Sequence, residues 1–413
     1  MKVLVLNCGS STLKFQLVET DAASERAATD RSLARGVVDG IGANAVLKLD
    51  VSARGEKPVR EGVDAKDVRA AVERSLALVC RGDLGLASEP GEIEAVGHRV
   101  VHGGERFRES VLIDDGVVEG IEACFDMAPL HNPANLRGYR AAREILPGVP
   151  HVAVFDTSFH QRMPREAFFY GLPYVLYERY GIRRYGFHGT SHRYVSRRLA
   201  QILGRPADDP SLRLVTLHLG NGCSGAAIRG GTSIDTSMGF SPLEGLLMGT
   251  RSGDVDPAAL LHVVTREELS PAEANALLNK HSGLLGLSGR SGDMRHLLEA
   301  EAEGDDRARL AIEVFTYRVK KCVAAYFGVL GGIDGLAFAG GIGENAPSIR
   351  ARSLEGLEAL GIRLDEERND AARGAEREIS PEGARCRVFA IPTNEELLIA
   401  RDTCRIVSGR KPD

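Results

Sequence analysis

Apolar and polar positions alternate along the chain in a way that predicts a mixed α/β protein. The apolar run Val3–Leu6 stops at a polar turn and resumes at Leu13–Val18, which predicts a β-hairpin. Strand-like runs continue over 33–60, and the apolar residues of 65–84 recur at helical spacing. The first part of the chain is therefore expected to fold as an α/β domain.

The second half repeats this outline. A strand over 212–219, a Gly/Asn/Ser turn and a further strand resemble the opening hairpin, which indicates a duplicated fold. Between the two hairpins we expect a strand from 93, a helix over 134–145 and a strand over 151–155. A helix over 306–330 and a strand over 335–339 follow, and glycine-rich loops are expected at 248–254, 283–295 and 339–345. Each such loop has the alternative interpretation of a purely structural turn.

Composition limits the classes of function. A length of 413 residues indicates two or three domains, and 43% hydrophobic with 26% charged residues is typical of a globular protein. The net charge of -5 gives no reason to expect nucleic acid or an anionic membrane surface as partner. The seven cysteines stand singly, which argues against a zinc knuckle or a disulfide framework. No apolar stretch is long enough for an export signal or a membrane span, so we expect a cytoplasmic protein.

The polar turn of the opening hairpin carries groups that an oxyanion could use. Gly9 lets backbone N–H groups converge, Ser10 and Thr12 supply hydroxyls, and Lys14 supplies a positive charge. The alternative is a surface turn with a solvated lysine. There is no Gly-Lys dipeptide and no His-Arg-Asp motif, which excludes a Walker P-loop and disfavours a protein kinase. A metal site at the two histidines of His188-Gly-Thr-Ser-His192 is also disfavoured, because the motif lacks the zincin glutamate.

Seven motifs, in order along essentially the whole chain, resemble the acetate kinase family. They are Asn-Cys-Gly-Ser-Ser-Thr-Leu-Lys at 7–14, Gly-His-Arg-Val-Val-His-Gly-Gly at 97–104, Tyr-Gly-Phe-His-Gly-Thr-Ser-His at 185–192, His-Leu-Gly-Asn-Gly at 218–222, Met-Gly-Thr-Arg at 248–251, Gly-Gly-Ile-Gly-Glu at 340–344 and Thr-Asn-Glu-Glu at 393–396. The resemblance implies the duplicated actin, Hsp70 and sugar-kinase fold, which is ribonuclease H-like and has a cleft between its domains. It also implies a first domain of 1–155 plus a returning segment 394–413, and a nucleotide-binding domain of 156–393.

The chemistry implied by the resemblance is reversible transfer of the γ-phosphoryl group of ATP to acetate, giving acetyl phosphate and ADP by direct in-line transfer. Acetate is already ionised at neutral pH, so the site needs cations and hydrogen-bond donors more than a base. The implied cofactor is Mg²⁺, with Mn²⁺ as the alternative ion, and the implied assembly is a homodimer. No nucleic acid or membrane partner is expected.

The resemblance also assigns roles to residues. Asp156, His188, Arg251 and Arg99 are the implied catalytic residues, and Arg99 with Val101, Leu130, His131 and Pro242 would bind the substrate. Asn7 and Glu395 are the implied metal ligands. We expect Asp156 to orient an arginine or to act through the water shell of the metal. The implied nucleotide-binding residues are Lys14, Ser10, Thr12, His218, Leu219, Gly220, Asn221, Gly222, Asp293, Met294, Arg295, Gly340, Gly341, Ile342, Gly343 and Glu344.

Two residues depart from the family pattern, and two alternatives to acetate kinase remain open. Thr12 replaces a usual serine and keeps the hydroxyl, while Cys8 replaces a small apolar residue and predicts a loop sensitive to alkylation. One methylene in an apolar pocket discriminates by only about 1 to 3 kcal/mol, so propionate kinase is the near alternative and butyrate kinase a more distant one. The alternative from another class is a non-catalytic ATP-binding module of the actin and Hsp70 type. The alternative for His131 is a loop histidine that supports the turn at 129–133.

Overall fold

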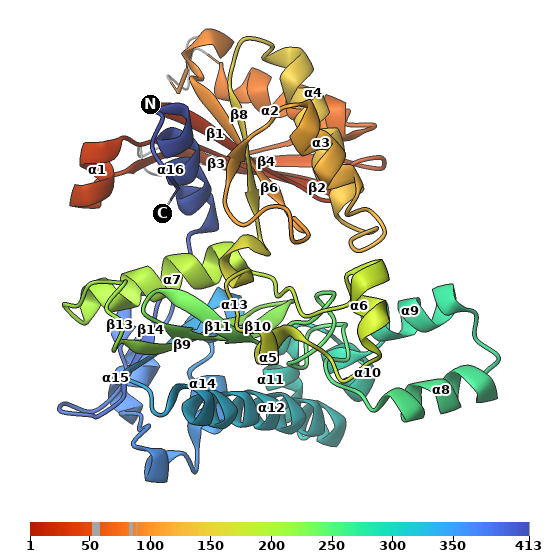
Figure 1. Cartoon of the computed structure of the whole chain (residues 1–413), viewed down its shortest axis with the longest axis vertical. Coiled ribbons are helices and arrows are strands. Elements are labelled where there is room, and N and C mark those ends of the chain that lie inside the picture. Colours follow the sequence, from red (N-terminus) through yellow and green to blue (C-terminus); the bar gives the residue numbers. More distant parts are fainter. Residues whose placement is uncertain (52–57, 82–85, 88, 413) are drawn as a thin grey trace. The chain divides into compact units, whose positions relative to one another are not determined.

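The computed structural model describes residues 1–51, 58–81, 86–87 and 89–412, which divide into two compact units (Figure 1). Unit 1 comprises Met1–Phe159 and Asn394–Asp413, and unit 2 comprises His160–Thr393. Part of the strand region expected over 33–60 and the end of the helix expected over 65–84 lie outside the described residues. None of the described helices combines the length and the apolar character that a membrane span requires.

Unit 1 is built on an eight-stranded sheet with the order β5-β4-β3-β2-β1-β6-β8-β7. Its central strands β1, β6 and β8 run parallel, and β2 pairs antiparallel with β1. The strands of this unit are β1 (Lys2–Cys8), β2 (Thr12–Glu19), β3 (Arg31–Asp39), β4 (Val46–Asp50), β5 (Val59–Gly62), β6 (Ala95–Val100), β7 (Val111–Leu112) and β8 (His151–Phe155). Its helices are α1 (Ala22–Ala27), α2 (Val68–Val79), α3 (Asp115–Glu122), α4 (Asn132–Ile145) and α16 (Glu395–Val407).

The alternation of side chains along β1 explains how helices cover both faces of this sheet. Leu4 and Leu6 point into a core shared with α2 and α4, whereas Val3 and Val5 pack with Ile399 and other residues of α16. Because β1 is buried on both faces, its sequence is a continuous apolar run. The C-terminal helix thus forms part of unit 1.

Unit 2 contains a six-stranded sheet with the order β11-β10-β9-β12-β14-β13. The strands are β9 (Arg213–Leu219), β10 (Cys223–Arg229), β11 (Thr232–Thr236), β12 (Gly335–Ala339), β13 (Arg377–Glu378) and β14 (Arg387–Ala390). The helices are α5 (Arg165–Phe168), α6 (Tyr174–Tyr180), α7 (Gly189–Ile202), α8 (Pro257–Arg266), α9 (Pro271–Lys280), α10 (Gly283–Ser288), α11 (Met294–Ala302), α12 (Asp306–Leu330), α13 (Gly340–Asn345), α14 (Pro347–Leu354) and α15 (Glu366–Ala371). Helix α12 contacts β9 and β10, and α7 contacts β9 and β12.

The two sheets share one core topology. In unit 1 an antiparallel hairpin, β1 and β2, is followed by the parallel partners β6 and β8. In unit 2 the hairpin β9 and β10 is followed by the parallel partners β12 and β14. The prediction of a duplicated α/β fold is therefore confirmed.

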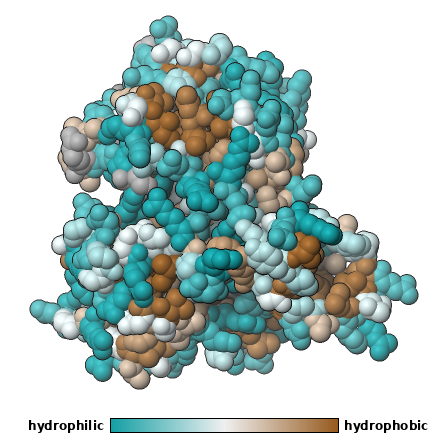
Figure 2. Space-filling view, viewed as in Figure 1, coloured by the Kyte–Doolittle hydropathy of each residue, from teal (hydrophilic) through white to brown (hydrophobic). Residues whose placement is uncertain are grey.

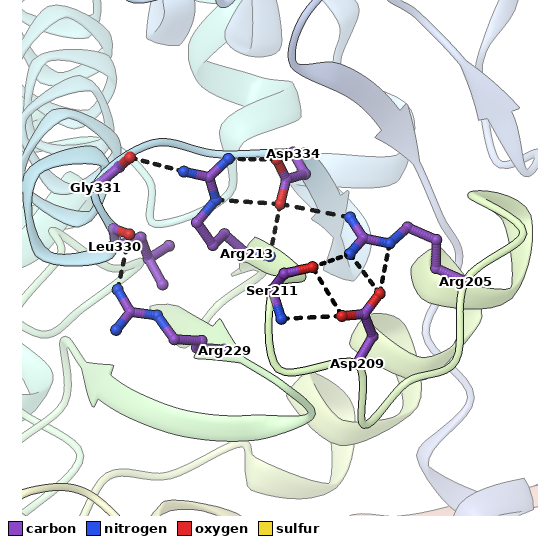
Figure 3. A network of polar contacts seen from close by, with 8 residues as sticks. All are labelled: Arg205, Asp209, Ser211, Arg213, Arg229, Leu330, Gly331 and Asp334. Atoms are coloured by element: carbon purple, nitrogen blue, oxygen red, sulfur yellow. Dashed lines mark hydrogen bonds and ion pairs between the residues drawn. The ribbon is translucent and has the colours of Figure 1, made fainter.

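A polar network fixes the amino ends of β9 and β12 (Figure 3). Arg213, the first residue of β9, donates from Nη2 to Oδ1 of Asp334 at 2.6 Å and from its backbone N to Oδ2 at 2.9 Å. Its Nη1 reaches the carbonyl of Gly331, the residue that caps α12, at 2.8 Å. Arg205 joins the network, with Nη1 3.9 Å from Asp334 and Nε 2.9 Å from Oδ2 of Asp209. The amino ends of these strands are thus occupied by structural ion pairs, and the candidate functional loops follow the carboxyl ends.

Two sequence-based expectations about unit 2 are corrected, and five of its helices had no expectation. The segments 283–295 and 339–345 were expected as loops, but they contain α10, the start of α11 and all of α13. These helical segments are short and rich in glycine, so their periodicity is too weak to indicate a helix. The helices α5–α9 had not been expected either, and most of them present few buried residues that would create an apolar pattern.

Candidate functional site

Polar side chains gather at the carboxyl ends of the parallel strands in unit 1. Asn7 lies at the end of β1, Arg99 lies near the end of β6, and Asp156 follows β8 directly. Parallel strands end at the same edge of a sheet, which is where ligands bind in open α/β sheets. The topology therefore brings together three residues that are up to 149 positions apart in sequence.

Arg99 and Asp156 form a bidentate ion pair. Nε of Arg99 donates to Oδ1 of Asp156 at 2.9 Å and Nη2 donates to Oδ2 at 2.6 Å, while Nη1 reaches Oδ1 of Asn7 at 3.3 Å. The side chain of Asp156 is 1% exposed and that of Arg99 is 21% exposed. Burial alone would lower the pKa of Arg99, but Asp156 and Glu395 raise it above its ordinary value. Both carboxylate oxygens of Asp156 are thus engaged in holding the guanidinium.

Glu395 adds a further carboxylate to this part of unit 1. It is the first residue of α16, after Asn394, whose side chain caps the helix by accepting from the backbone N of Leu397 at 3.1 Å. Burial raises the pKa of Glu395 to about 7, and the negative charges of Asp156 and Glu396 act in the same direction, against Arg99. Carboxylates thus crowd together here, and added positive charge would favour their ionised forms.

The turn between β1 and β2 is tight and mostly accessible. The N–H of Gly9 donates to the carbonyl of Thr12 at 2.7 Å, Ser10 is exposed, and Lys14 pairs with Asn7 across the hairpin. The expectation that Cys8 makes this loop sensitive to alkylation is wrong. Cys8 is 3% exposed, a Cβ at Gly138 of α4 would lie 2.1 Å from its Sγ, and burial raises the pKa of the thiol to about 12.

Two asparagines that sequence reasoning had not singled out brace the strand ends. Asn135 accepts from the backbone N of Val101 at 3.1 Å and donates to the carbonyl of Cys8 at 2.7 Å. Asn132 accepts from the backbone N of His102 at 3.0 Å and donates to its carbonyl at 2.8 Å. Their only signal in the sequence is a spacing of three on the first turn of a helix. This turn follows His131, which is half-buried, and Leu130, which is 48% exposed.

In unit 2, His188 and Arg251 converge on the bare Cα of Gly222. A Cβ at Gly222 would lie 3.2 Å from Cε1 and Nε2 of His188 and 3.6 Å from Nη2 of Arg251. Arg251 is held by its Nη1, which donates to the carbonyl of Pro242 at 2.7 Å. The ring of His188 lies 4.3 Å from that of His218, measured between centroids. The structure thus places a guanidinium and an imidazole beside Gly222, while Nε2 of His218 would lie 3.7 Å from a Cβ at Gly220.

A pocket of about 910 Å³ opens in the same unit. Seven of the residues expected to bind nucleotide line it, namely Gly220, Asn221, Asp293, Met294, Arg295, Gly341 and Ile342. Its volume falls in the range of small-molecule sites. Arg373 and Asn345 also line it, and sequence reasoning had missed them because Arg373 lies outside every glycine-rich motif and Asn345 was noted only as the end of one.

Charged side chains of unit 2 organise the segments next to this pocket. Oε1 of Glu344 accepts from the backbone N of Gly340 at 2.9 Å and from that of Thr393 at 3.0 Å. Asp293 caps α11, and its hydrogen bonds from Arg295 lower the pKa of its carboxyl to about 2. The side chain of Arg295 is 83% exposed, so its guanidinium face is accessible to a ligand.

The remaining expected nucleotide residues, Leu219 and Gly343, lie next to each other, since a Cβ at Gly343 would be 3.7 Å from Cβ of Leu219.

Comparison with known proteins gives a consistent result over the full length. The sequence model of the acetokinase family matches residues 2–401. The chain is 51% identical over 412 residues to the acetate kinase of Thermoanaerobacter pseudethanolicus, covering 100% of both chains. The crystal structure of Porphyromonas gingivalis acetate kinase superposes with a TM-score of 0.91 at 45% identity, covering 98% of this chain and 99% of the other. A propionate kinase from Francisella tularensis gives a TM-score of 0.88 at 41% identity, covering 97% and 98%. The chain therefore belongs to the acetokinase family.

Proposed function

We propose that the protein transfers the γ-phosphoryl group of ATP to the carboxylate of acetate, giving acetyl phosphate and ADP, and catalyses the reverse reaction. The observation that carries this proposal is the convergence of His188 and Arg251 on Gly222. Gly220 and Asn221, which precede Gly222 directly, line the pocket of the same unit. Phosphoryl transfer to an acceptor that is already ionised requires charge stabilisation and no general base. These residues supply cations and donors of that kind.

The roles proposed for the residues come from the family resemblance, and for some of them the surroundings add support. In unit 1, Arg99 forks onto the substrate carboxylate or the phosphoryl oxygens, and Asp156 orients Arg99 because both of its oxygens already accept from that guanidinium. In unit 2, His188 and Arg251 contact the transferring phosphoryl group, and the 910 Å³ pocket holds the nucleotide. Val101, Leu130 and Pro242 are proposed to contact the acyl methyl, with His131 near the phosphate. Ser10, Thr12 and Lys14 are proposed to hold phosphate oxygens.

We propose Mg²⁺ as the cofactor, with Mn²⁺ as an alternative, held by Asn7 and Glu395. An amide oxygen and a carboxylate are hard oxygen ligands of the type Mg²⁺ prefers, and a bound cation would favour the ionised form of Glu395, whose pKa burial raises. Among the described residues, no group of three or more His, Cys, Asp or Glu side chains forms a metal cage. Mg²⁺ usually keeps several of its waters and is bound through one or two protein oxygens together with substrate phosphates. When bound, the ion would neutralise charge on the phosphate oxygens.

Short carboxylates distinguish the candidate functions. The purified protein with ATP, Mg²⁺ and each acid in turn should form hydroxamate from hydroxylamine, with a larger kcat/KM for acetate than for propionate or butyrate. The similarity to a propionate kinase makes propionate the second candidate acceptor. If kcat/KM for propionate exceeds that for acetate tenfold or more, propionate replaces acetate as the proposed acceptor. If no acid gives hydroxamate, the result favours a non-catalytic ATP-binding module.

Arg251→Ala tests the placement of the phosphoryl site. We expect kcat to fall by about 10³-fold or more, because an arginine that stabilises the transferring group is worth on the order of 10³ to 10⁵ in rate. Binding of ATP, measured by calorimetry, should survive. The control is Arg309→Ala, which removes a half-exposed arginine on α12 and should change neither quantity. Intact turnover in Arg251→Ala would remove this residue from the catalytic set.

Asn7→Ala tests the metal ligands. The Mg²⁺ concentration that gives the half-maximal rate should rise, because one of the two proposed protein oxygens is lost. Asn44→Ala changes an exposed asparagine of unit 1 and serves as the control. An unchanged Mg²⁺ dependence in Asn7→Ala would contradict the assignment.

We further propose that two copies associate through the face formed by α6, α8 and α9 of unit 2. None of these three helices has a buried residue, and Tyr180 and Leu261 are 62% and 65% exposed. Figure 2 shows apolar residues gathered in this region. Short helices that bury nothing gain little from packing, and a large exposed apolar patch is typical of an interface. We propose a second copy of this protein as the partner that covers this face, because the family resemblance implies a homodimer.

Leu261→Asp is expected to convert the dimer to monomers in analytical ultracentrifugation, because the carboxylate would have to be buried in the interface. Val329→Asp places the same charge at another exposed apolar position of unit 2 and should leave the dimer intact. A wild-type protein that sediments as a monomer at micromolar concentration would contradict the proposal.

A further inference from the structure

A chain of buried hydrogen bonds leads from β9 to His188. Oγ1 of Thr216 lies 2.7 Å from Nδ1 of His192, Nε2 of His192 lies 2.8 Å from Oγ of Ser224, and Oγ of Ser224 lies 2.9 Å from Nδ1 of His188. Thr216, His192 and Ser224 are each at most 1% exposed. The two histidines of the 188–192 motif are thus joined through a serine, a connection that nothing in the sequence indicates.

The single hydroxyl proton of Ser224 links the protonation states of His188 and His192. Ser224 has one hydroxyl proton and lies between two ring nitrogens, so it can donate to only one of them and must accept from the other. If Ser224 donates to Nδ1 of His188, then Nε2 of His192 must carry a proton. A neutral His192 then accepts at Nδ1 from the hydroxyl of Thr216. One consistent direction therefore runs from Thr216 to His188.

His192 remains neutral in these surroundings. Burial lowers the pKa of its imidazole well below the ordinary value, and the nearby rings of His160 and His218 act in the same direction. A neutral imidazole carries a single proton, so its two nitrogens have opposite roles. The hydrogen-bond chain accordingly has a direction.

We infer that Ser224, His192 and Thr216 are positioning residues that hold His188 as the Nε2–H tautomer, ready to donate to an oxygen of the transferring phosphoryl group. This inference rests on the proposed function of His188. Nε2 is the ring nitrogen beside Gly222 and Arg251, whereas Nδ1 faces Ser224. If each of these hydrogen bonds ran in the opposite direction, Nε2 of His188 would carry no proton. Its lone pair would then face the phosphoryl oxygens, and the two would repel each other.

The backbone at His188 supports a positioning role. His188 precedes the first turn of α7 with a φ of +55°, a left-handed conformation that is unfavourable for a residue with a Cβ. Such conformations persist where surrounding contacts over-determine them, and they concentrate at functional sites. The hydrogen bond from Ser224 fixes the ring that this backbone conformation presents. The charged and titratable neighbours of that ring include His218 on β9, at 4.3 Å between ring centroids, and Arg251 across Gly222.

The tautomer can be measured directly in the wild-type protein. Nitrogen-15 chemical shifts of the histidine rings, assigned with a His188→Gln sample, should show a protonated Nε2 and an unprotonated Nδ1 for His188 near neutral pH. Any other protonation pattern at His188 overturns the inference. Because this measurement needs neither substrate nor turnover, it remains decisive if the variants below fold poorly.

Ser224→Ala provides the kinetic test. We expect kcat to fall about 10- to 100-fold, the range typical when a hydrogen-bond partner of a functional histidine's far nitrogen is removed, with little change in KM for ATP. Ser224→Thr, which restores the hydroxyl, should recover part of the loss. Thr216→Val, at the far end of the chain, should lower kcat to a smaller extent and without a change in KM.

The matched control is Ser233→Ala. Ser233 is equally buried and bonds Nδ1 of His160 at 2.7 Å, but it makes no hydrogen bond to the chain that ends at His188. Equal losses of kcat in Ser224→Ala and Ser233→Ala would overturn the inference and indicate a general packing role. Wild-type protein with the Nε2–H tautomer but no transfer to any short carboxylate would instead refute the proposed function, so the two failures are distinguishable.

Discussion

The ion pair between Arg99 and Asp156 is the interaction on which the candidate site of unit 1 depends. Asp156 is almost completely buried, and an isolated buried carboxylate would cost several kcal/mol. The parallel pairing of β6 with β8 places the two side chains at one sheet edge, where two hydrogen bonds satisfy both carboxylate oxygens. The guanidinium thereby has one orientation, which also brings it within reach of Asn7.

The candidate site of unit 2 depends on polar side chains that lie close to glycine backbone. Gly222 admits His188 and Arg251, and Gly249 admits Asn221, whose Oδ1 would lie 2.1 Å from a Cβ there. At Gly340 the φ of +75° and the backbone of Leu219, 2.7 Å from a built Cβ, leave no room for a side chain. These glycines let polar groups from different loops meet at short distance. The same core topology thus carries an ion pair in one unit and, in the other, the glycine-lined side chains that we propose contact the phosphoryl group.

Much of the fold could be predicted from the sequence, because its strongest signals are local. The hairpins at β1–β2 and β9–β10 follow from apolar runs broken by polar turns, and α12 follows from a long periodic pattern. Helices α8 and α9 gave no such pattern because neither buries a residue. The bracing by Asn132 and Asn135 and the link from His192 to His188 arise only from tertiary contacts. The spacing of three between the asparagines and of four between the histidines does not specify which groups these side chains contact.

In the proposed reaction, phosphoryl transfer to the acceptor carboxylate involves no proton transfer, and Asp156 acts by holding Arg99. The most direct measurement is the solvent deuterium isotope effect on the single-turnover rate of acetyl phosphate formation by the wild-type protein. An effect close to unity is predicted, because ionised acetate has no proton to lose at neutral pH. A large normal isotope effect would contradict transfer without a proton and assign Asp156, or another side chain, a role in proton transfer.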